Sequence, residues 1–148
     1  MRRILFGLAA VSLLAATACS PAEEAPAPEV KKSLARQAVF YQGQGQVQSL
    51  TSGVISKAAD GALQLQADAI LPSAGYTETG FEPRIYAAPP PDGIYEVDVV
   101  ATEPKSPSAA VETKVTIKGA WAGYKKDRLK GVKMISKTNA VVAMLPPG

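Results

Sequence analysis

The chain has 148 residues, a formal net charge of +3, a single cysteine and no histidine. The lack of histidine excludes Ser-His-Asp and Cys-His catalysis and every zinc site that uses a histidine ligand. A lone cysteine cannot form an internal disulfide, and a charge this small gives no case for nucleic-acid binding. We therefore expect no cofactor and no metal.

Within residues 1–18, Arg2 and Arg3 follow the initial Met, and an uncharged run rich in Leu and Ala comes after them. The run has about 15 residues, which is fewer than the roughly 20 that a membrane-spanning helix needs. A basic start, a short apolar run and small residues at its end predict a secretory signal peptide. The alternative is a buried N-terminal helix, which would have to be apolar on all sides within a small domain.

The segment 14–19, LAATAC, ends on the only cysteine. It resembles the lipobox of bacterial lipoproteins, although Ala16 stands where that family usually has Leu. The resemblance implies that Cys19 is lipidated and holds the chain on a membrane. It also implies, from Ser20 in place of Asp, the outer membrane, with the rest of the chain facing the periplasm. The other interpretations of Cys19 are a free thiol and half of an intermolecular disulfide.

Residues 19–46 are rich first in Pro, Ala and Glu and then in Gly and Gln. Such a composition buries too little apolar surface to offset the entropy lost on ordering. We therefore predict a flexible tether over 19–46 and one domain over 47–148, whose roughly 100 residues are enough for a modest core.

Alternating apolar and polar residues, with turn residues between them, predict about seven short strands in this domain. The strands are expected at Val47–Ala58, Ala62–Leu71, Phe81–Ala87, Ile94–Ala101, Val111–Trp121, Val132–Ser136 and Ala140–Leu145. The first two should form a hairpin across Asp60-Gly61, and the last two a hairpin across Thr138-Asn139. The expected fold is all-β, a small antiparallel Ig-like β-sandwich, with a small barrel as the alternative.

Three short motifs of the domain resemble small, uncharacterised, exported bacterial β-proteins. They are Glu82–Tyr86, Pro90–Ile94 and Leu129–Val132, the last followed by Thr138-Asn139. The resemblance implies a compact exported β-domain and assigns no functional residues.

Glu96 and Asp98 are expected on the same face of one strand, about 7 Å apart. Glu82 joins them if its strand pairs with theirs across the Pro/Asp/Gly turn. Three carboxylates could bind Ca²⁺ or act as the acid and base of a glycan hydrolase. The competing interpretation is a solvated strand face that pairs with a basic residue: Arg84, Lys114 or Lys118.

Charge is unevenly distributed along the domain. Acids outnumber bases nine to three from Lys57 to Glu112, and bases outnumber acids eight to one from Lys114 to Lys137. The densest basic cluster consists of Lys125, Lys126, Arg128, Lys130 and Lys133. It could contact an anionic envelope component, such as lipid headgroups, lipopolysaccharide phosphates or an acidic protein. Otherwise it is a solvated loop, or an internal complement to the acidic region Asp92–Glu103.

The sequence therefore predicts a lipid-anchored envelope protein with a non-catalytic interaction domain of unidentified partner. One alternative is a carboxylate-based hydrolase of envelope glycans. Another is an inhibitor of a periplasmic enzyme that acts through the loop Ala88–Gly93.

Overall fold

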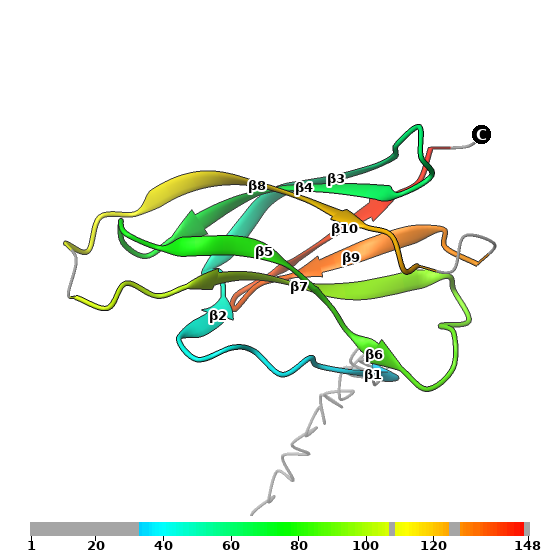
Figure 1. Ribbon diagram of the computed structural model, residues 1–148, viewed down its shortest axis with the longest axis horizontal. Coiled ribbons are helices and arrows are strands. Elements are labelled where there is room, and N and C mark those ends of the chain that lie inside the picture. Colours follow the sequence, from blue (N-terminus) through cyan, green and yellow to red (C-terminus); the bar gives the residue numbers. More distant parts are fainter. Residues whose placement is uncertain (1–32, 107–108, 125–127, 147–148) are drawn as a thin grey trace, which may run out of the picture. The chain divides into compact units, whose positions relative to one another are not determined.

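The computed structural model describes residues 33–106, 109–124 and 128–146 (Figure 1). The predicted signal peptide, Cys19 and the first part of the predicted tether lie outside the described residues, as do Lys125 and Lys126. The described residues form ten β-strands and no helix. Accordingly, they include no helix that is long and apolar enough to cross a membrane.

One sheet has three antiparallel strands in the order β3-β4-β8, namely β3 (Ser49–Lys57), β4 (Leu63–Leu71) and β8 (Thr113–Trp121). β3 and β4 form the hairpin that was predicted across Asp60-Gly61. Gly61 has a φ of 80°, a left-handed conformation that glycine adopts without strain. The Asp60 carboxylate accepts a hydrogen bond of 2.9 Å from the Ala62 amide, which closes the turn.

The second sheet is built around β7 (Ile94–Thr102). Its order is β10-β9-β7-β2, with β5 also paired to β7. The other strands are β2 (Gln44–Gln46), β5 (Thr77–Pro83), β9 (Gly131–Ile135) and β10 (Ala140–Met144). The first half of β7 pairs with β9 and the second half with β2, so these two strands lie end to end along one edge of β7. β5 occupies the opposite edge.

The β7–β9 pair is parallel, whereas we had expected every pair to be antiparallel. Parallel neighbours need a long crossover connection. Here the chain leaves β7, forms β8 in the other sheet, and returns to β9. The predicted C-terminal hairpin is confirmed, since β9 and β10 pair in antiparallel register.

Two strands fall inside the segment that was predicted to be a flexible tether. β2 pairs with β7, and β1 (Ala35–Arg36) forms a two-stranded ladder with β6 (Ile85–Tyr86). Backbone pairing needs no apolar side chain, which is why composition alone missed these strands. The expected strand Phe81–Ala87 is split after Pro83, in keeping with the disruption that proline causes inside a ladder.

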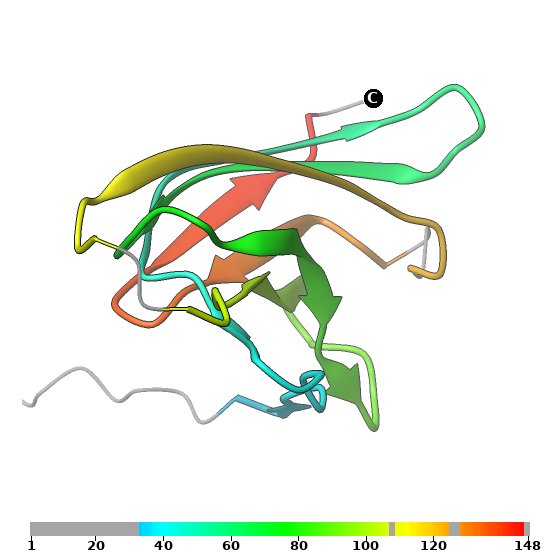
Figure 2. The same cartoon turned by 60° about the vertical axis from the view of Figure 1, so that its left-hand side comes forward.

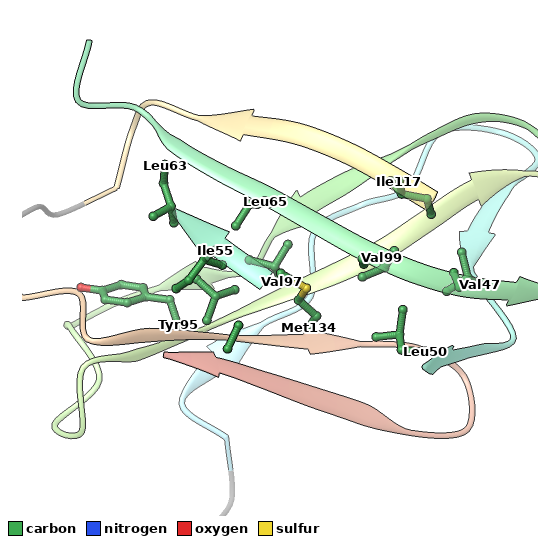
Figure 3. Packing of buried hydrophobic residues seen from close by; sticks show 14 of the residues in the cluster. Val47, Leu50, Ile55, Leu63, Leu65, Tyr95, Val97, Val99, Ile117 and Met134 are labelled. Atoms are coloured by element: carbon green, nitrogen blue, oxygen red, sulfur yellow. The ribbon is translucent and has the colours of Figure 1, made fainter. Parts of the chain in front are cut away.

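The two larger sheets pack face to face as two layers (Figures 1 and 2). Between them lie buried side chains from both sheets, including Leu63, Leu65 and Ile117 from one and Val97 and Met134 from the other (Figure 3). The all-β class and the sandwich arrangement are thus confirmed.

Two glycines lie where side chains of the facing sheet leave no room for a Cβ atom. A Cβ on Gly53 would lie 2.9 Å from the Met134 sulfur, and one on Gly119 would lie 2.8 Å from Cδ2 of Phe81. Both distances are shorter than a real carbon contact allows. Gly53 of β3 therefore packs against the Met134 side chain of β9, and Gly119 of β8 packs against the Phe81 ring of β5.

Candidate functional site

β7 is buried on both of its faces. Val97 and Val99 point into the core between the sheets, as the alternation predicted. Glu96, Asp98 and Val100 point to the opposite face, where we had expected solvent or an open site. Yet Asp98 and Val100 are 0% exposed and Glu96 is 9% exposed.

The cover over this outer face is the segment of residues 33–46, which we call the N-terminal strap. In Figures 1 and 2 the strap runs from β1 to β2 on the side of β7 away from β3, β4 and β8. Arg84, the single residue between β5 and β6, completes the cover, and its backbone amide donates to the Glu96 carbonyl at 3.0 Å.

Asp98 forms a bidentate ion pair with Arg84. The Nε of Arg84 donates to Oδ2 at 3.0 Å, and Nη2 donates to Oδ1 at 2.9 Å. The amide Nε2 of Gln46, on β2, donates to Oδ1 at 2.6 Å. Both oxygens of this fully buried carboxylate are therefore occupied by donors of the protein itself.

Glu96 is also bonded through both oxygens. Ser33 Oγ donates to Oε2 at 2.6 Å, and Arg84 Nη1 donates to the same oxygen at 3.2 Å. Lys133 Nζ lies 3.3 Å from Oε1. Lys133 is the register partner of Glu96 on the parallel strand β9, which places the two side chains on one face. The strap is thus fastened at one end by Ser33 to Glu96 and at the other by Gln46 to Asp98.

Two cations balance the two carboxylates of this cluster. The hydrogen bond to Asp98 is the main cause that holds the pKa of the Arg84 guanidinium above its ordinary value. Burial raises the pKa of Tyr86, whose hydroxyl accepts a hydrogen bond of 2.8 Å from the Glu96 amide. We call Arg84, Glu96, Asp98 and Lys133 the β7 charge cluster.

The structure brings the three predicted carboxylates to one face. Glu82 is the register partner of Asp98 and is half-buried. Its side chain makes no hydrogen bond or ion pair within the described part of the chain. Residues 33–106, 109–124 and 128–146 contain no group of three or more Asp, Glu, Cys or His side chains arranged to hold a metal ion. The pairing with Arg84 is confirmed, but the expectation that this face is solvated is wrong.

The described members of the predicted basic cluster are divided between two places. Lys125 and Lys126 lie outside the described residues. Arg128 and Lys130 are exposed beside the turn that precedes β7, where the Lys130 amide donates to the Gly93 carbonyl at 2.8 Å. Lys133 belongs instead to the β7 charge cluster. Lys133 thus pairs with Glu96, a residue of the acidic region Asp92–Glu103, and for this lysine the predicted internal pairing is confirmed.

A second carboxylate site lies on the outer face of the three-stranded sheet. Asp68, on β4, accepts a hydrogen bond of 2.6 Å from Ser52 Oγ and another of 2.6 Å from Thr116 Oγ1. These bonds, led by that from Ser52, lower the pKa of Asp68 below its ordinary value of 3.8. Alternation predicted that Asp68 points outward, but it gave no sign of the two hydroxyl partners on β3 and β8.

Ser33 and Gln46 were missed because they fall in the predicted tether. The sequence offered one usable signal, which is that Asp98 and Glu96 alternate with residues that must be buried.

Comparisons with protein-family models, curated proteins and solved structures found no match to this chain. Its function is therefore inferred from its own residues and their geometry.

Proposed function

We propose that this protein is a lipid-anchored component of the bacterial cell envelope, whose β-sandwich makes non-catalytic contacts with a partner. The anchor is the lipidated Cys19, and the domain faces the periplasm from the outer membrane. The support for the anchor is the sequence of residues 1–20, with its basic start, short apolar run and lipobox-like end.

The observation that carries the non-catalytic role is the burial of Asp98 with both its oxygens bonded. A general acid or base has to reach the proton that it transfers to or from a substrate. Asp98 cannot do so while Arg84 and Gln46 cover it, and Glu96 is similarly enclosed. Of the three carboxylates predicted for a glycan hydrolase, Glu82 alone is left accessible, whereas that chemistry needs two.

Metabolic labelling with an alkyne fatty acid tests the anchor in cells that express the full chain. We expect the native chain and the variant Ser20→Asp to incorporate the label, because both keep the cysteine. Ser20→Asp should also move the chain to the inner membrane. Cys19→Ala should lose the label, and an unlabelled native chain would refute the anchor.

Binding to immobilised lipopolysaccharide tests an anionic partner. The double variant Arg128→Glu with Lys130→Glu reverses two charges of the basic cluster. The matched control, Lys114→Glu with Lys118→Glu, makes the same charge change at exposed positions of β8. We expect binding to be lost in the first variant and kept in the second. Equal loss in both would show that only net charge matters.

The inhibitor alternative is favoured by one specific feature, the loop Ala88–Gly93. The loop is largely exposed, yet its turn is fixed by a 3.0 Å bond from the Gly93 amide to the Pro90 carbonyl. The Asp92 carboxylate also accepts a 3.0 Å bond from the Ile94 amide. A pre-ordered loop loses little entropy on binding. Hydrogen-exchange protection of residues 88–93 by a periplasmic hydrolase, with loss of that enzyme's activity, would support inhibition.

A further inference from the structure

The ladder of β1 and β6 has one inner and one outer face. Ala35 pairs with Tyr86, and Arg36 pairs with Ile85, so each pair shares a face. Tyr86 points inward, because its hydroxyl accepts a hydrogen bond from the Glu96 amide. Its ring also packs edge-on against that of Tyr95, with 5.2 Å between the ring centroids. The other pair faces outward, where Ile85 is 61% exposed.

Further apolar side chains are exposed along the strap. Leu34, two residues before Arg36, is 68% exposed, Val39 is 94% exposed and Tyr41 is 76% exposed. We call Leu34, Arg36, Val39, Tyr41 and Ile85 the strap surface. It combines aliphatic side chains with a tyrosine and an arginine. In the sequence, Lys31 and Lys32 directly precede the strap.

Such a combination suits the boundary between lipid headgroups and acyl chains. Aliphatic side chains enter the boundary region, a tyrosine ring sits at headgroup level, and basic side chains attract anionic lipids. No acidic residue occurs between Val30 and Tyr41, so nothing in this stretch opposes that attraction.

The position of the strap surface along the chain adds an independent argument. Ser33 is 14 residues after Cys19. Fully extended, 14 residues span at most about 50 Å, and the flexible coil that the composition predicts reaches about 20 Å on average. A bilayer that holds Cys19 is therefore the surface that the strap meets at the highest effective concentration.

We propose that the strap surface is a docking face for the anionic bilayer that carries the anchor; this proposal rests on the lipidation of Cys19. The strap lies on the side of β7 away from β3, β4 and β8 (Figures 1 and 2). Docking therefore turns the outer face of the three-stranded sheet, with Asp68 and its hydroxyl partners, toward the periplasm. The anchor then sets the orientation of the domain as well as its location.

The test uses the full lipidated chain in vesicles of phosphatidylethanolamine and phosphatidylglycerol. A solvent-sensitive fluorophore is attached at Val39→Cys on the strap, or at Gln66→Cys on the outer face of β4 as the matched control. Lipids with a spin label at the headgroup should quench the Val39 probe strongly and leave the Gln66 probe nearly unchanged. Flotation of the vesicles reports separately whether the anchor holds.

Two further variants make the result specific. Leu34→Asp with Ile85→Asp should abolish the quenching while flotation persists, and Val54→Asp, an exposed site on the other sheet, should change neither. Arg36→Gln should lower the ratio of docked to undocked domain about fivefold, the effect of removing one basic residue from an anionic surface.

Each result that contradicts the proposal is distinct. If the chain floats but both probes are quenched alike, the anchor stands and docking is refuted. If the chain does not float, the anchor fails and docking fails with it. If the quenching of the Val39 probe disappears at one chain per vesicle, the strap surface binds a second copy and the bilayer is refuted as its partner.

Discussion

β4 and β7 are the central strands of their sheets, and each carries an aspartate on its outer face. Asp68 on β4 and Asp98 on β7 both accept a hydrogen bond as short as 2.6 Å. Among the described side chains, Asp68 has two hydroxyl donors and no other, and it stays in contact with solvent. Asp98 has an arginine fork and an amide, and is completely buried. Alternation assigns a face to each residue, but the coverage of that face is decided by a segment far away in the sequence.

The chemistry of the two sites follows from this difference in coverage. Water screens the charge of Asp68, so neutral donors are sufficient partners. A carboxylate removed from water needs a cation and further hydrogen bonds to offset its lost hydration. Arg84 supplies that cation at the break between β5 and β6, where the chain folds over β7. The N-terminal strap and the arginine therefore depend on each other.

The largest effect should come from Arg84→Met, which leaves Asp98 buried and without its cation. We expect the free energy of unfolding to fall by about 3–5 kcal/mol, the usual cost of breaking a buried ion pair from one side. Urea unfolding measures this loss. Arg84→Lys keeps the charge but loses the bidentate hydrogen bonding, and it should lower the free energy of unfolding by less. A loss near zero for Arg84→Met would mean that Asp98 is hydrated in solution.

A smaller effect is expected for Gln46→Ala, which removes the 2.6 Å bond from the strap to Asp98. A hydrogen bond to a charged group contributes about 1.5–3 kcal/mol. The loss should be accompanied by faster hydrogen exchange of the amides of β2 and of Val47, whose amide donates to Val99. Gln48→Ala, two residues further along the chain, serves as the control, and equal effects in the two variants would contradict this role for Gln46.

Ser33→Ala should have a still smaller effect, because Ser33 lies at the exposed start of the strap. Loss of its bond to Glu96 is expected to cost about 1 kcal/mol. Amide exchange should speed up around β1 and remain unchanged at β2, since Gln46 still fastens that end. Faster exchange along the whole strap would instead show that the strap opens as a single unit.

The smallest effect concerns Asp68 and depends on pH. Its folded pKa is lowered, so the folded state holds the proton less tightly than the unfolded state, and stability from this site is present above pH 3.8. It is lost as the pH falls through the lowered pKa. Carboxyl titration by NMR should show Asp68 titrating below its ordinary value, and Ser52→Ala with Thr116→Val should move it back. An unchanged midpoint would refute the hydroxyl contribution.

Local features of the fold were predictable because local residues determine them. Asp60-Gly61 defines the β3–β4 turn, and the alternation from Ile94 to Ala101 separates the core face of β7 from its outer face. The strap was not predictable, since its pairing uses backbone groups and its composition is that of a linker. The parallel β7–β9 pair, which brings Lys133 to Glu96, also depends on a contact between distant segments. The sequence therefore identified the carboxylates of β7, but it did not identify the strap that covers them.

The central claim concerns the strap. Asp98 is a buried, structural residue because the strap covers it, whereas Asp68, in the same position on the central strand of the other sheet, has no such cover and stays open to solvent. The most direct test is the same substitution at both sites, Asp98→Asn and Asp68→Asn, measured by urea unfolding at pH 7. We predict a loss of about 3 kcal/mol for Asp98→Asn and a clearly smaller loss for Asp68→Asn. Equal losses at the two sites, or a larger loss at Asp68, would contradict the claim.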